Sequence, residues 1–102
     1  MDWLDPWGPV TTEHATALVA ELVAELRPGH ALHGIGATAL GARADQDDVL
    51  FALDDGRVAV VHLTWAGPRE RPPWPGTRVY ADLGDWIARG MAADHADWTE
   101  AR

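Results

Sequence analysis

The chain has 102 residues and a formal net charge of −8, with no cysteine, no lysine and no serine. The length suits one domain, and the missing cysteines exclude disulfides and thiolate metal sites. A membrane span is excluded because no apolar run approaches roughly 20 residues. Scattered arginines in an acidic chain disfavour nucleic acid as a partner, and the acidic N-terminus, unlike a secretory signal, predicts a cytoplasmic protein.

The first part of the chain predicts an arm followed by a helix. Residues 1–10 are rich in tryptophan and proline, which break regular structure and leave two indoles in need of a pocket. Apolar residues then recur at three- and four-residue intervals over 11–27. This spacing predicts an amphipathic helix, which the sequence Arg27-Pro28-Gly29 ends.

Residues 35–65 predict a β-meander. A weak strand over 35–44 precedes two strong strands, 49–54 and 57–65. Asp55-Gly56 between them is typical of a two-residue type I′ turn, which would place Phe51 opposite Val60 and put both, with Val49 and His62, on one face. Both faces are then mainly apolar, so each needs a cover.

The C-terminal part predicts a proline- and tryptophan-rich loop over 66–78, a short edge strand over 78–81 and a second helix over 82–98. Asp82 is suited to cap this helix, and Gly90 permits close packing. The expected fold is α+β in a single domain, 1–102. It has an N-terminal helix, a three- or four-stranded antiparallel meander and a C-terminal helix, with both helices on the sheet.

Two clusters resemble metal sites only superficially. His30 and His33 could join His62 at zinc, but they fall in a loop, and no HExxH or CxxC motif supports them. The aspartates between 45 and 48 resemble the start of a calcium loop, but the glycine and the acid that such a loop needs further on are missing. We therefore predict a solvated turn there, and neither a metal nor a cofactor.

His62 is the one side chain that could centre a chemical site. A mid-strand imidazole needs a hydrogen-bond partner, and Thr64, Trp65 and His33 could line a ligand pocket with it. The residues favour the other interpretation, a core histidine satisfied by a carbonyl or by Thr64. Without a serine or cysteine nucleophile we assign no catalytic residue, and whether the protein is an enzyme stays open.

The loop around Trp65 and Trp74 is the other candidate site. Arg69 and Arg71 lie between the two indoles, and the segment formally matches an RxxPxxP ligand pattern, a motif short enough to occur by chance. The residues favour a structural role in which Trp74 folds back as a lid on the sheet edge, because a large indole is more often packed than presented. Alternatively, partly exposed indoles beside arginines would form an interface hot spot.

Several segments together resemble a family of small, uncharacterised bacterial proteins. They are Asp47-Asp-Val-Leu-Phe51, Asp54-Asp-Gly56, Ala59-Val-Val-His-Leu-Thr-Trp65, Pro72-Pro-Trp74, Tyr80 and Trp86. The resemblance covers residues 30–91 and is most specific at His-Leu-Thr-Trp. It implies the α+β fold but brings no activity and no catalytic residues.

The sequence favours a non-enzymatic interaction protein that binds through Trp65, Arg69, Arg71 and Trp74. It could neutralise a basic partner, as small acidic immunity proteins do, or form a homodimer that buries one sheet face. The alternative is a small-molecule binder or enzyme with its pocket at His62.

Overall fold

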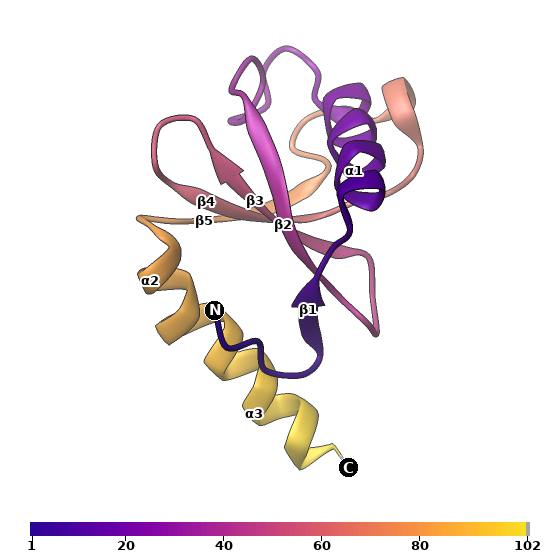
Figure 1. Ribbon diagram of the computed structural model, residues 1–102. Helices are drawn as coiled ribbons and strands as arrows, with labels where there is room; N and C mark the ends of the chain where they lie inside the picture. The colour runs from indigo at the N-terminus through magenta and orange to yellow at the C-terminus, as the bar shows by residue number, and fades with distance from the viewer. Residues whose placement is uncertain (102) are drawn as a thin grey trace.

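The computed structural model describes residues 1–101 and has an α+β fold (Figure 1). One antiparallel sheet holds five strands in chain order, so every neighbour in the sheet is also a neighbour in sequence. The strands are β1 (Trp7–Pro9), β2 (Ala37–Arg43), β3 (Asp48–Leu53), β4 (Val58–His62) and β5 (Gly76–Tyr80). The expected meander is confirmed, but the predicted three or four strands are wrong, because the arm contributes β1 as a fifth.

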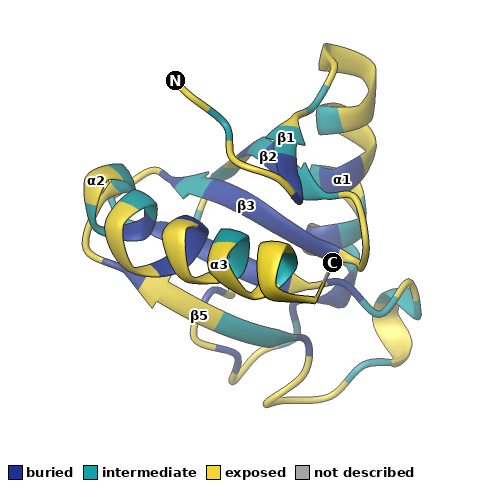
Figure 2. Cartoon of the chain, turned by 90° about the horizontal axis from the view of Figure 1, so that it is seen from below, coloured by how far each residue is buried: buried dark blue, intermediate teal, exposed yellow. Residues whose placement is uncertain are grey.

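The helices lie on opposite faces of the sheet (Figures 1 and 2). On one face lies α1 (Thr12–Glu25), which begins where the Thr11 hydroxyl accepts a hydrogen bond from the His14 N–H, 3.1 Å away. The other face carries a continuous helical run: α2 (Leu83–Trp86), the π-helical turn η2 (Ile87–Met91) and α3 (Ala92–Glu100). Asp82 caps this run as predicted, accepting from the Asp85 N–H at 2.8 Å.

The β3–β4 hairpin differs from its prediction by one residue of register. Phe51 pairs with Ala59 instead of Val60, and Asp48 pairs with His62. The predicted type I′ turn is wrong because only Gly56 adopts a positive φ, +92°, whereas that turn needs two such residues. The loop therefore has three residues, 54–56, and the Gly56 N–H donates to the Leu53 carbonyl at 3.0 Å.

This register decides which side chains share a face. A one-residue slip moves every side chain of a strand to the opposite face relative to its neighbour. Phe51 consequently packs with Ala59 and Val61 under α1, whereas Val60 packs with Leu50 against the α2–α3 side. Both faces are apolar, as predicted, and the chain covers both itself, which removes the reason to expect a homodimer that buries one of them.

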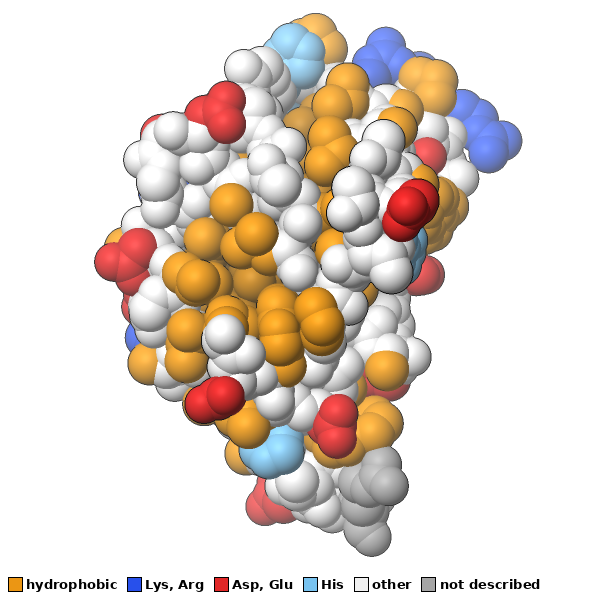
Figure 3. Space-filling model, viewed as in Figure 1, with side chains coloured by type: hydrophobic (Ala, Val, Ile, Leu, Met, Phe, Trp, Pro, Cys, Tyr) orange, Lys and Arg blue, Asp and Glu red, His pale blue; other side chains and the backbone are white. Residues whose placement is uncertain are grey.

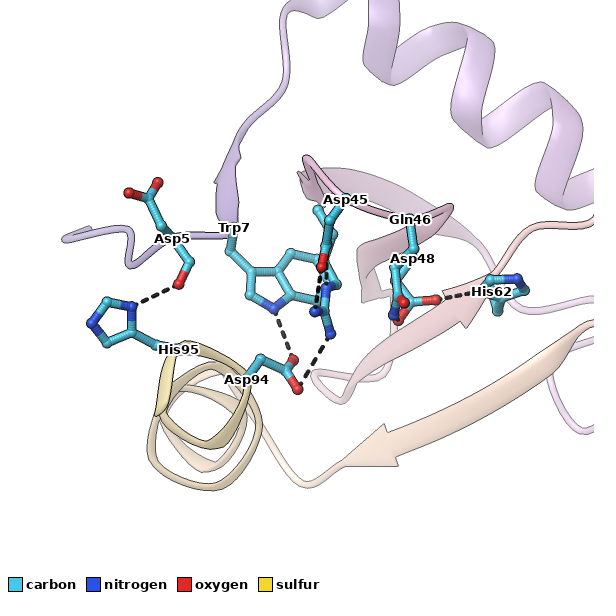
Figure 4. Close-up of polar contacts among 9 residues, drawn as sticks. Asp5, Trp7, Asp45, Gln46, Asp48, His62, Asp94 and His95 are labelled. Atoms are coloured by element: carbon cyan, nitrogen blue, oxygen red, sulfur yellow. Dashed lines mark hydrogen bonds and ion pairs between the residues drawn. The ribbon is translucent and has the colours of Figure 1, made fainter. Parts of the chain in front are cut away.

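The arm is ordered because its tryptophans find a pocket on the α2–α3 face. Trp7 is buried, and its ring meets Trp86 edge to face with centroids 5.1 Å apart. The Trp7 Nε1–H donates to Asp94 of α3 at 2.9 Å, and the same carboxylate contacts Arg43 at 3.4 Å (Figure 4). The His95 ring bonds the Asp5 carbonyl at 2.7 Å, so these contacts tie the arm to the end of the chain.

Within residues 1–101, no helix combines the length and the apolarity that crossing a membrane requires.

Candidate functional site

The six candidate residues from the sequence fall in two places. His62 ends β4 on the face that carries α2 and α3. The other five lie in the segment between β4 and β5, residues 63–75, here called the Pro/Trp loop. This loop includes a short 3-10 turn, η1 (Gly67–Arg69), which packs beside α1.

Two glutamates of α1 hold the start of the Pro/Trp loop. The Glu25 carboxylate accepts hydrogen bonds from the backbone N–H of Thr64 at 3.0 Å, from the Thr64 hydroxyl at 3.1 Å and from the Trp65 N–H at 2.9 Å. One turn earlier, Glu21 accepts from the Gly67 N–H at 3.1 Å. Thr64 is therefore an anchor of the loop and its hydroxyl is already occupied.

Glu25 is a buried acid in an otherwise apolar stripe of α1. It is 0% exposed, and burial, followed by the neighbouring Glu21 carboxyl, raises its pKa above the ordinary 4.5. The hydrogen bonds from Thr64 and Trp65 favour the carboxylate and act in the opposite direction. The site thus places a carboxyl that resists ionisation directly beneath the loop backbone.

Two further contacts hold the rest of the loop. Arg27, just beyond α1, donates to the Pro68 carbonyl. The His30 Nδ1 accepts the Leu32 N–H at 3.0 Å, so Nε2 carries the hydrogen and donates to the Pro75 carbonyl at 3.0 Å. His30 is a buried structural side chain, and residues 1–101 contain no group of three or more possible metal ligands.

Both loop indoles are exposed, although side chains hold the loop backbone at Trp65 and at Pro75, the residue after Trp74. Trp65 is 50% exposed and Trp74 is 56% exposed, so the favoured prediction that Trp74 is a packed lid is wrong. Trp65 has φ of +59°, which is rare for a bulky residue. Its N–H bond to buried Glu25 helps to hold this conformation.

The two indoles occupy opposite ends of the loop. Trp65 borders a small hollow of about 100 Å³ with His14 and Leu18 of α1. Trp74 borders a larger hollow of about 430 Å³ with His30 and the exposed Val79 of β5. The exposed side chains of Arg69 and Arg71 lie between the two indoles in sequence.

His62 forms a separate site. The favoured prediction of a core histidine bonded to a carbonyl or to Thr64 is wrong, because 54% of the side chain is exposed and its partner is Asp48. Its Nδ1 lies 2.6 Å from Asp48, whose carboxylate is buried and also accepts a 2.5 Å hydrogen bond from Gln46 (Figure 4). These residues line a hollow of about 300 Å³ with Thr77 and Arg78. The structure does not bring Thr64, Trp65 or His33 to this hollow.

The predicted His62 pocket is not assembled because β4 ends at His62. His62 lies on the α2–α3 face, whereas Thr64, beyond the end of the strand, bonds Glu25 on the α1 side. The correct register would have revealed the partner, since Asp48 stands directly opposite His62. The anchoring role of Glu25 had one sequence signal, a glutamate between Leu22 and Leu26 on the apolar stripe of the helix.

No protein-family model, no curated protein and no solved structure matches this chain.

Proposed function

We propose that this protein is a non-enzymatic interaction module that binds a partner through the Pro/Trp loop. The observation that carries the proposal is the pair of half-exposed indoles, Trp65 and Trp74, on an anchored loop. Four side chains from residues 21–30 hold the backbone of this loop by hydrogen bonds. Tryptophan and arginine are the residues most enriched at energetically dominant interface positions. Arg69 and Arg71 supply the second type.

Anchoring matters because ordering a surface on binding costs free energy. Immobilising a flexible side chain costs about 0.5–1.5 kcal/mol, and ordering a free loop adds to this. Here Glu21, Glu25, Arg27 and His30 already fix the loop backbone. The left-handed backbone at Trp65 is the kind of local strain that persists where the surroundings impose it, often at a binding site.

Affinity capture tests the proposal with matched baits. The baits are the wild-type chain, Trp74→Ala and Val23→Ala, the last removing an exposed apolar side chain of α1 outside the loop. A stoichiometric partner should be retained by wild type and Val23→Ala and lost with Trp74→Ala. A partner that Trp74→Ala retains, or no partner at all, contradicts the proposal.

The partner is a second protein or a second copy of this chain. A second copy would join through the loop, because each sheet face is already covered. We also propose that the protein is cytoplasmic, because a chain without cysteine suits a reducing compartment.

A second candidate function is supported by the Asp48–His62 bond. An aspartate that accepts the Nδ1–H of a histidine fixes the tautomer and leaves Nε2 free for a ligand. With 54% of its side chain exposed, His62 can present Nε2 to the hollow that Arg78 also lines. On this alternative, His62→Gln abolishes ligand binding while Trp74→Ala leaves it unchanged.

A further inference from the structure

The arginines divide into two groups according to their partners. Arg43, Arg57 and Arg89 each form an ion pair with an aspartate. The other arginines between residues 1 and 101, which are Arg27, Arg69, Arg71 and Arg78, form no ion pair with a carboxylate of that range.

Three of these four arginines belong to the Pro/Trp loop or touch it. Arg69 and Arg71 are exposed in the loop, and Arg27 reaches its backbone at Pro68. In Figure 3 the most extensive arginine surface of this face lies at the upper right, where Figure 1 places the turn that follows β4. Red acidic side chains are scattered over the face, and some red lies directly beside the blue surface.

The acids near the loop offset this charge only in part. Glu25 is buried and Glu21 is half-buried, and both are directed to loop N–H groups. Glu70, between the two exposed arginines, is half-buried. At the Trp65 end, exposed Asp47 borders the same hollow as the indole, so the positive charge that the loop presents is that of Arg69 and Arg71, on a chain whose net charge is −8.

From this charge distribution we propose that the Pro/Trp loop binds an acidic protein segment. Its carboxylates pair with Arg69 and Arg71, and an apolar or aromatic side chain enters the hollow beside Trp74 and Val79. Arginine suits this role because its planar guanidinium donates two parallel hydrogen bonds to a carboxylate. The inference rests on the proposed function and replaces the basic partner that the overall charge suggested.

A nucleic acid would offer the same negative charge and could stack its bases on the indoles. The remainder of the molecule argues against it, because an extended polyanion also passes close to acidic surface that repels it. A short acidic segment can confine its charges to the loop. The favoured occupant is therefore a peptide-like segment, and a single-stranded DNA oligonucleotide serves as the competing probe.

Selection from a displayed random peptide library tests two claims: that the Pro/Trp loop is a binding surface, and that the segment it binds is acidic. Peptides of about 12 residues span roughly 40 Å when extended, comparable with the longest dimension of the molecule, 38 Å. Wild type is the target, and peptides that also bind a folded Trp65→Ala/Trp74→Ala variant are removed. The expected survivors are enriched in Asp and Glu around an aromatic or aliphatic residue.

The outcomes distinguish a failure of the acidic-segment inference from a failure of the proposed function. Survivors that are basic or neutral overturn the acidic-segment inference and leave the loop as the binding surface. If no peptide depends on the two tryptophans, the proposed function fails as well. Oligonucleotide binding at the loop that is tighter than that of the best peptide also overturns the inference.

Calorimetry on one acidic survivor then tests the arginines. Arg69→Gln and Arg71→Gln should each weaken binding about tenfold, the size expected for one charge-assisted contact. Arg57→Gln is the matched control, because Arg57 pairs with Asp55 at the distant hairpin turn and should leave affinity unchanged. Equal effects of all three substitutions would show a general charge effect and overturn the assigned contacts.

Discussion

Gly90 is the position where a single methyl group should be most informative about the core. A Cβ at residue 90 would lie 2.4 Å from Cδ1 and 2.7 Å from Nε1 of Trp86, and 3.1 Å from the Tyr80 hydroxyl. Trp86 is completely buried, and Trp3 and Trp7 both meet it edge to face. The indole is therefore enclosed, and moving it away from residue 90 would disturb these ring contacts.

Two opposing terms set the effect of Gly90→Ala. Overpacking a well-packed core costs typically 1–3 kcal/mol, and a 2.4 Å approach to a fixed ring belongs at the upper end. Replacing glycine within a helix contributes about 1 kcal/mol of stability in return. We expect a net loss of about 1–2 kcal/mol in the free energy of unfolding, which lowers Tm by about 4–16 °C for a domain of this size.

Gly84→Ala is the matched control, measured by urea denaturation and thermal melting beside Gly90→Ala. A Cβ at Gly84 would meet only Asp82, at an ordinary 3.5 Å. Its stability should equal that of wild type or exceed it by up to about 1 kcal/mol. If Gly90→Ala is as stable as Gly84→Ala, the indole of Trp86 is not fixed by its neighbours and the packing argument is refuted.

Three further predictions concern the loop and the arm. Glu25→Gln tests pH dependence: because the folded-state pKa of Glu25 is raised, its contribution to stability is complete below about pH 4.5 and is lost as pH rises through the folded value. The stability of wild type minus that of Glu25→Gln, from urea titrations, should therefore fall as the pH is raised above about 4.5. A rise contradicts the assignment. Asp94→Asn removes the ionic acceptor shared by Trp7 and Arg43 and should lower the free energy of unfolding by about 1–3 kcal/mol, measured by chemical denaturation. An unchanged denaturation midpoint would mean that the arm does not depend on this contact. Trp74→Ala should change stability by less than about 0.5 kcal/mol, because the indole is exposed, whereas a collapse of Tm in calorimetry would restore the lid interpretation.

Most of the fold could be predicted from local patterns. The period of apolar residues and the Thr11 and Asp82 caps located both helical regions to within a few residues. The register of the central hairpin could not be predicted in this way, since Asp55-Gly56 fits two turn types and only the backbone at Asp55 distinguishes them. The strand at Trp7 was missed because its pairing with β2 depends on a distant tryptophan pocket.

For the candidate site, too, the sequence predicted the features that depend on local composition and missed those that depend on tertiary contacts. Tryptophan and arginine composition was enough to single out the Pro/Trp loop, but whether Trp74 is packed or exposed depends on tertiary contacts. Sequence also placed His62 and Thr64 on one face, which fails because β4 ends at His62 and Thr64 turns toward Glu25. Glu25 and Asp48 organise the two sites through long-range contacts. The position of Glu25 on the apolar stripe of α1 marks it as unusual but does not identify Thr64 and Trp65 as its partners, and Asp48 is found opposite His62 only in the correct register.

The central claim is that the Pro/Trp loop is the binding surface. The most direct test is a map of backbone amide chemical shifts on ¹⁵N-labelled protein, recorded as the captured partner or a selected peptide is added. The account predicts saturable shifts concentrated in residues 63–75 and at Val79, with small changes at Gln46, Asp48 and His62. Shifts centred on that His62 hollow, with the loop unchanged, would contradict it and favour the ligand-binding alternative.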